Sequence, residues 1–138
     1  MLNCPLPTDS QIERAIAELL ASGALTPRYF YHESHDSARI AFAWLDAQKT
    51  VKAGNTCYPV KHMVESWGCR YCSTDSVRLA AYLHPRIRGK YPSFNLSRRL
   101  VWPNPSRLAE IREAGIHPGY TGKYLDLYPV REGGSYGS

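Results

Sequence analysis

The sequence predicts a compact, mainly α-helical domain with a small β element. Apolar side chains recur at helical spacing in several segments, and most of these segments begin at a capping residue and end near Gly or Pro. Only one short stretch alternates between apolar and polar residues with a period of two. The 138 residues, of which 43% are hydrophobic, suit one domain, which we place at residues 1–130 with a flexible Gly- and Ser-rich tail at 131–138.

The first expected helix covers about residues 9–22. It follows Thr8 and Gln11, which have the form of a capping box. The second expected helix, 34–49, overlaps the run HESHD at 32–36. This run is not H-E-x-x-H, so we interpret it as helix capping rather than as a catalytic motif.

The third and fourth expected helices are 60–67 and 74–84. Pro59 stands where a first helical turn tolerates proline, and an apolar stripe follows at Val60, Met63, Val64 and Trp67. Ser73 or the next residue is a suitable N-cap for the fourth helix, which should end before Pro85 because the residue before a proline avoids the helical conformation.

Two shorter helices and one strand complete the expected elements. Ser93 can cap a short polar helix over 93–100, and a helix over 106–114 would end at Gly115. The alternation of apolar and polar residues over 124–128 is typical of a strand.

Basic residues are concentrated in one third of the chain. The formal net charge is +5, yet the segment 76–109 contains no acidic residue. Its seven basic residues are Arg78, Arg86, Arg88, Lys90, Arg98, Arg99 and Arg107. Such asymmetry favours a polyanionic partner, although a solvated basic surface remains the alternative. Four aromatic residues lie among these cations, and they suit either base stacking or, for Phe94 and Trp102, the core; they are Tyr82, Tyr91, Phe94 and Trp102.

The helix pair 74–84 and 93–100 resembles the helix-turn-helix core of winged-helix DNA-binding proteins, with 60–67 as the preceding packing helix. The resemblance covers about residues 60–103, and its connection over 84–93 is longer than a standard turn of three or four residues. It implies that helix 93–100 enters the major groove. Base edges would then be read by Asn95, Ser97, Arg98 and Arg99, and phosphates contacted by Arg86, Arg88 and Lys90.

Four residues have the chemistry of zinc ligands, namely Cys57, His62, Cys69 and Cys72. The spacing of Cys69 and Cys72 is that of a zinc knuckle. Only one such cysteine pair is present, so two interpretations stay open: a zinc site, or small side chains beside a turn. We favour the second and expect no other cofactor.

These observations predict a small DNA-binding protein, regulatory in function and of bacterial, phage or mobile-element type. The chain offers no phosphate-binding loop, nucleophile elbow or paired carboxylates, so we do not expect an enzyme. The alternative is a protein-binding inhibitor or adaptor, for example an anti-CRISPR protein, whose basic surface acts on a nucleic-acid-binding partner.

The first residues lack the basic and apolar regions of a secretory signal, and no apolar run is long enough to span a bilayer. We therefore expect a cytoplasmic protein without a membrane partner. The first two helices would complete the core or form the interface of a homodimer.

Overall fold

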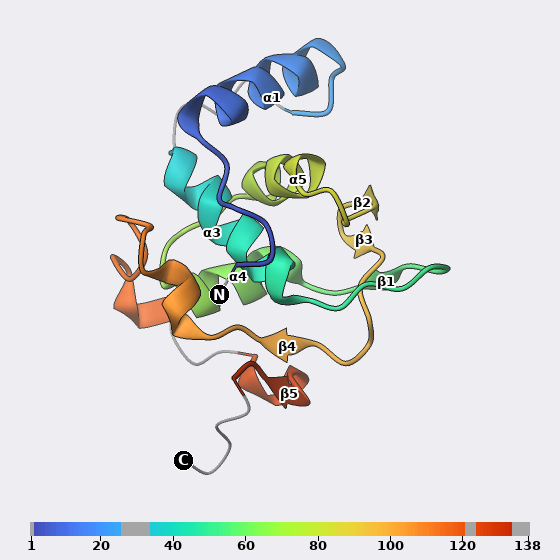
Figure 1. Ribbon diagram of the computed structural model, residues 1–138, viewed down its shortest axis with the longest axis vertical. Coiled ribbons are helices and arrows are strands. Elements are labelled where there is room, and N and C mark those ends of the chain that lie inside the picture. The colour runs from blue at the N-terminus through green and yellow to red at the C-terminus, as the bar shows by residue number, and fades with distance from the viewer. Residues whose placement is uncertain (1, 26–33, 121–123, 134–138) are drawn as a thin grey trace.

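The computed structural model describes residues 2–25, 34–120 and 124–133. In these ranges it contains four α-helices, which are α1 (Asp9–Ala21), α3 (His35–Ala47), α4 (Val60–Gly68) and α5 (Thr74–Leu83). Three short 3₁₀ helices follow, η1 (Pro105–Leu108), η2 (Pro118–Tyr120) and η3 (Leu125–Leu127). The prediction of a mainly helical domain is confirmed (Figure 1). None of the helices in these ranges is both long and apolar enough to cross a bilayer.

The helix starts that were predicted from capping residues are confirmed for α1 and α5. The hydroxyl of Thr8 accepts from the backbone N–H of Gln11 at 3.2 Å, and the Gln11 side chain accepts from the backbone of Thr8 at 2.8 Å. At α5, the hydroxyl of Ser73 accepts from the backbone N–H of Ser76 at 3.1 Å. Each bond satisfies a backbone donor that has no partner within its own helix.

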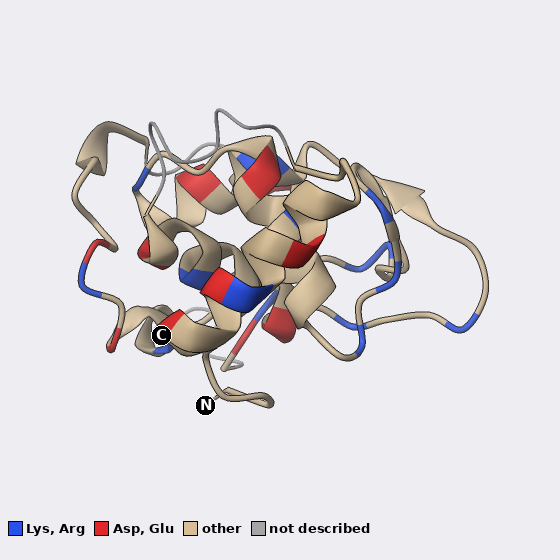
Figure 2. Ribbon diagram, turned by 90° about the horizontal axis from the view of Figure 1, so that it is seen from above, with Lys and Arg blue, Asp and Glu red and all other residues tan. Residues whose placement is uncertain are grey.

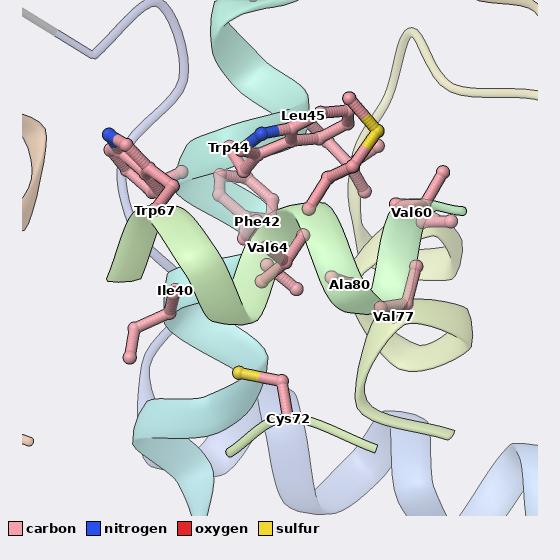
Figure 3. Packing of buried hydrophobic residues seen from close by; sticks show 14 of the residues in the cluster. Ile40, Phe42, Trp44, Leu45, Val60, Val64, Trp67, Cys72, Val77 and Ala80 are labelled. Carbon is pink, nitrogen blue, oxygen red and sulfur yellow. The ribbon is translucent and has the colours of Figure 1, made fainter. Parts of the chain in front are cut away.

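Helix α3 lies at the centre of the molecule and packs against the other three helices (Figure 1). Every residue from Ile40 to Leu45 is apolar and buried, which is typical of a helix surrounded by other elements. Figure 3 shows Trp44 and Leu45 of α3 lying beside Val64 and Trp67 of α4. A smaller apolar cluster joins α1 to this core, formed by Ile12, Ala15, Ile16, Leu19, Leu25, Ala38 and Leu79.

The end of α4 approaches α3 closely. A Cβ placed on Gly68 would lie 2.4 Å from Cγ2 of Ile40, so only glycine fits there without movement of the core. The left-handed residue that ends the helix is Cys69, with φ of 50°, rather than the glycine itself.

In the described part of the chain, five two-residue strands form two small sheets. β1 (Thr56–Cys57), β3 (Ser93–Phe94) and β2 (Gly89–Lys90) pair antiparallel in that order. β4 (Val101–Trp102) pairs in parallel with β5 (Val130–Arg131). The β2–β3 turn depends on Gly89, whose φ is 108° and whose missing Cβ would lie 2.3 Å from the carbonyl oxygen of Ser93.

The predicted helix over 93–100 is wrong. β3 covers its first two residues, and Leu96 forms an antiparallel bridge with Thr50. Phe94 and Leu96 are both 1% exposed, so the apolar side chains two residues apart are buried from an extended chain rather than from one face of a helix. The major-groove helix that the helix-turn-helix hypothesis needs is therefore not formed by this segment.

Two other expectations need correction. The segment expected as helix 106–114 contains η1 and turns, and the expected strand over 124–128 is a left-handed Tyr124 followed by η3. Regular structure also reaches into the expected tail, because Arg131 pairs in β5. The last five residues of that tail, 134–138, lie outside the described residues, as do residues 32 and 33 of the HESHD run.

Candidate nucleic-acid interface

The three-stranded sheet is built entirely from chain without acidic residues. Segments 47–64 and 76–109 contain no Asp or Glu, and between them they supply β1, β2 and β3. Basic residues from two segments that are distant in sequence are thus brought to one part of the molecule.

Backbone hydrogen bonds hold the loops of these segments side by side. The N–H of Ser97 donates to the carbonyl of Lys49 at 2.8 Å, and that of Val51 donates to the carbonyl of Asn95 at 3.0 Å. The guanidinium of Arg88 reaches the carbonyl of Lys52 at 3.5 Å. The lysines of the first segment therefore lie beside the arginines of the second.

Six exposed cations surround this sheet, and we call this surface the basic loop face. It consists of Lys49, Lys52, Arg88, Lys90, Arg98 and Arg99. None of the six has a carboxylate within ion-pair distance among the described residues. In Figure 2 the loops on the right of the view carry Lys and Arg only, whereas the helices carry both signs of charge.

Three of the predicted basic site residues have carboxylate partners instead. Arg78 pairs with Asp75 at 2.8 Å, one turn away on α5, and Arg86 approaches Asp46 at 3.4 Å. Arg107 is only 3% exposed and pairs with Asp46 at 2.8 Å and with Glu132 at 2.6 Å. The expectation that Arg107 is available to nucleic acid is therefore wrong.

Asn95 was predicted to read bases, but it is 3% exposed and holds the β-hairpin together. Its side-chain oxygen accepts from the N–H of Arg88 at 2.7 Å, and its side-chain nitrogen donates to the carbonyl of Arg86 at 3.0 Å. The predicted reader Ser97 accepts from the N–H of Arg99 at 3.1 Å. Arg98 and Arg99 alone of the four predicted readers present exposed side chains.

Asp46 is the centre of the most buried charged network in the described chain. Its side chain is fully buried and accepts from the backbone of Asn3 at 2.7 Å, from His84 at 2.7 Å and from Arg107 at 2.8 Å. Burial alone would raise the pKa of Asp46, but the hydrogen bonds from His84 and Arg107 outweigh it and hold that pKa well below its ordinary value.

The same network includes the one group of three potential metal ligands in the described ranges, Cys4, Asp46 and His84. The residues do not suit a cation. Nδ1 of His84 accepts from the backbone of Arg86 at 3.2 Å, so Nε2 carries the hydrogen that it donates to Asp46. The carboxylate already has donors on both oxygens, two of them from arginines, so the group forms a structural network.

The four residues considered for zinc are not brought together. Cys57 and His62 are exposed, whereas Cys72 is buried, with its thiol 3.6 Å from the carbonyl of Ser37. Cys69 caps the end of α4. All four lie in described parts of the chain, and no three of them place ligand atoms within 4.8 Å of one another.

Of the four aromatic residues among the arginines, two pack in the interior and two lie at the surface. Phe94 is buried in the core, and Trp102 packs edge-on against Tyr128 with ring centroids 5.1 Å apart. Tyr82 is 52% exposed, and Tyr91 is partly exposed beside the hairpin. Two tyrosines thus remain accessible beside the basic loop face.

Sequence reasoning missed Lys49 and Lys52, because it considered only the longer acid-free segment. The same signal, a run of chain without Asp or Glu, is present over 47–64 and would have found them. Their proximity to Arg88 and to 95–97 depends on hydrogen bonds between distant segments, which have no local signature in the sequence.

Comparison of the chain with protein-family models, with curated proteins and with solved structures finds no match.

Proposed function

We propose that this protein binds nucleic acid, with DNA as the partner, through the basic loop face. The observation that supports the proposal is the set of six exposed cations without carboxylate partners among the described residues. Exposed cations that lack an internal partner contribute little to folding, and clustered on one face they provide the positive field that attracts a phosphate backbone.

The proposed mode of binding uses loops and a β-hairpin rather than a recognition helix. Arg88 and Lys90 lie at the hairpin, and Arg98 and Arg99 lie on the loop that follows it. Arginine can donate two parallel hydrogen bonds to one phosphate, and lysine acts as a point charge. Contacts of this kind position nucleic acid without reading its sequence.

The test is a fluorescence-anisotropy titration of the protein with labelled random-sequence duplex DNA at several salt concentrations. Binding through phosphates predicts that log K falls linearly with log salt, with a slope of about −0.9 for each phosphate neutralised. Replacing both Arg98 and Arg99 by Ala should reduce the steepness of that slope by about 2 and leave the unfolding midpoint unchanged.

The matched control is the double variant Arg14→Ala with Arg112→Ala. Both arginines are exposed, lie outside the basic loop face and have no ion pair in the described structure, so this variant removes the same charge from elsewhere. Its salt slope should equal that of the wild type. Absence of binding at low salt would overturn the proposal and would direct the search to a protein partner.

A further inference from the structure

A groove of about 760 Å³ lies between the end of α1, the exposed side of α5 and the β2–β3 hairpin. Its apolar lining includes Leu25, Ala81, Ile87 and Phe94, all of them buried. A groove of this size is in the range that holds a small molecule or one unit of a polymer. Figure 1 shows the loop after α1 and the hairpin on the same side of α5.

The rim of the groove carries two cations and two aromatic rings. Lys90 is exposed and has no carboxylate partner among the described residues. The guanidinium of Arg78 lies 5.7 Å from the centre of the Tyr91 ring, and the exposed ring of Tyr82 lies on the α5 side. Arg78 is already paired with Asp75, so Lys90 is the cation that offers a partner for a phosphate, and the exposed ring of Tyr82 offers a stacking surface for any base.

The Tyr91 ring is held in place on two sides. Its hydroxyl accepts from the backbone N–H of Lys61 at 3.2 Å, and its ring packs edge-on against Phe94 with centroids 6.1 Å apart. Tyr91 is therefore a fixed part of the groove lining, and it loses little conformational freedom when a ligand enters the groove.

The charges at the rim are not symmetric. The hydroxyl of Tyr82 donates to the carboxylate of Glu18 on α1 at 3.0 Å, so the α1 end is negative. Lys90 stands on the hairpin, at the opposite side of the groove. A phosphate is therefore attracted to the hairpin side and repelled from the α1 side.

We propose that this groove binds a single nucleotide unit, with its base stacked on Tyr82 over the apolar lining and its phosphate beside Lys90. The inference rests on the proposed function, because Lys90 belongs both to the groove and to the basic loop face. The unit has two sources, an unpaired nucleotide of a strand or a free mononucleotide, and both share this chemistry.

The experiment compares two labelled single strands of about twelve nucleotides, a length typical of single-strand binding sites. One strand is oligothymidine, and the other consists of abasic sites. The two carry the same number of phosphates. We expect oligothymidine to bind at least about tenfold more tightly, which corresponds to one stacked base. Equal affinity for the two strands, or absence of binding to both, overturns the proposed nucleotide site in the groove. The proposed function is tested separately, by the salt dependence of duplex binding described above.

The variant Tyr82→Ala should bring the affinity for oligothymidine towards that for the abasic strand. Tyr82 is half exposed, so its removal does not open the core. The matched control is Tyr124→Ala, which removes an exposed tyrosine outside the groove and should keep the preference. Loss of the preference in both variants, or in neither, contradicts the proposal.

Calorimetric titration with thymidine monophosphate and with thymidine distinguishes the sources. Binding of the monophosphate that is lost in Lys90→Ala and kept in Lys52→Ala identifies the groove as a site for free nucleotides as well. A preference for oligothymidine without measurable monophosphate binding supports the strand as the source. If Lys90→Ala has no effect on either ligand, the phosphate position beside Lys90 is wrong.

Discussion

The core around Asp46 and the basic loop face use charge in opposite ways. Asp46 and Arg107 are buried together, and their other partners come from three distant parts of the chain, at Asn3, His84 and Glu132. Arg98 and Arg99 are exposed on a loop and have no carboxylate partner among the described residues. The same residue type, arginine, is thus a structural element in one region and an unpaired surface charge in the other.

This difference shows that the ion-pair partners of a charged residue have to be known before the residue can be given a role in the fold or in binding. Arg107 and Arg98 belong to one acid-free segment and are indistinguishable by local composition. Buried charges that lose a partner are costly to the fold, whereas exposed charges contribute little to it. Substitutions in the two regions should therefore separate effects on stability from effects on binding.

Asp46→Asn should have the largest effect on stability. It removes the negative charge that compensates buried Arg107 and replaces one acceptor oxygen by a donor that faces His84 or Arg107. We expect the free energy of unfolding to fall by about 3–5 kcal/mol, measured by urea denaturation. The control Asp126→Asn, an exposed carboxyl, should change it by less than about 0.5 kcal/mol. Equal unfolding midpoints in the two variants would show that the network does not support the fold.

Asn95→Ala should destabilise the protein by about 1–3 kcal/mol, because the backbone groups of Arg86 and Arg88 lose their partners. Asn55→Ala, in the exposed loop before β1, is the matched control. The ratio of affinities for different duplex sequences should stay unchanged in Asn95→Ala. A changed ratio without a change in stability would restore Asn95 as a reader of bases.

The stability of the wild type should fall in acid more steeply than that of Asp46→Asn. The pKa of Asp46 is lowered by folding, so below its ordinary value of 3.8 the unfolded chain binds the proton more tightly than the folded chain does. Stability from this carboxylate is present above that pH and is lost as the pH falls further. The difference in slope between the two proteins approaches about 1.4 kcal/mol per pH unit, measured by urea denaturation between pH 4 and pH 2. If the free energies of unfolding of the two proteins fall with equal slopes in acid, the pKa of Asp46 is not lowered by folding.

Lys49→Ala with Lys52→Ala should have the smallest effect on stability, below about 0.5 kcal/mol. The same double variant should reduce the steepness of the salt dependence of duplex binding by about 2, because two phosphate partners are lost. The variant of Arg14 and Arg112 is again the control for total charge. A large loss of stability would show that these lysines support the fold, as Arg107 does.

The parts of the fold that the sequence predicts correctly are those with local causes. α1 and α5 begin at capping residues, and α3 and α4 carry apolar faces longer than two turns. Each of these signals acts within a few residues of its effect, because capping bonds and helical periodicity are local.

The segment 93–100 was misassigned because its causes are distant. Phe94 and Leu96 alternate, but the alternation is too short to exclude a helix, and Ser93 resembles an N-cap. Three features decide the extended conformation: pairing of β3 with β1, the bridge from Thr50 to Leu96, and the side-chain bonds of Asn95. Two of these features involve residues about forty positions away, so a prediction from neighbouring residues cannot include them.

The candidate site was predicted in part for the same reason. The concentration of cations was visible, and Arg88, Lys90, Arg98 and Arg99 are exposed as expected. Which cations would be neutralised was not visible, since Asp46 and Glu132 meet Arg107 only in the folded chain. The groove likewise forms between α1, α5 and the hairpin, and no single segment contains it.

The network around Asp46 also sets the time at which folding can finish during synthesis. Its members come from residue 3, from α3, from the end of α5, from η1 and, through Arg107, from Glu132. The indole N–H of Trp44 likewise donates to the hydroxyl of Tyr128 at 2.9 Å. A ribosome-bound chain that has not yet exposed residue 132 therefore lacks groups that its buried charges require, so folding is completed only after that residue has left the exit tunnel.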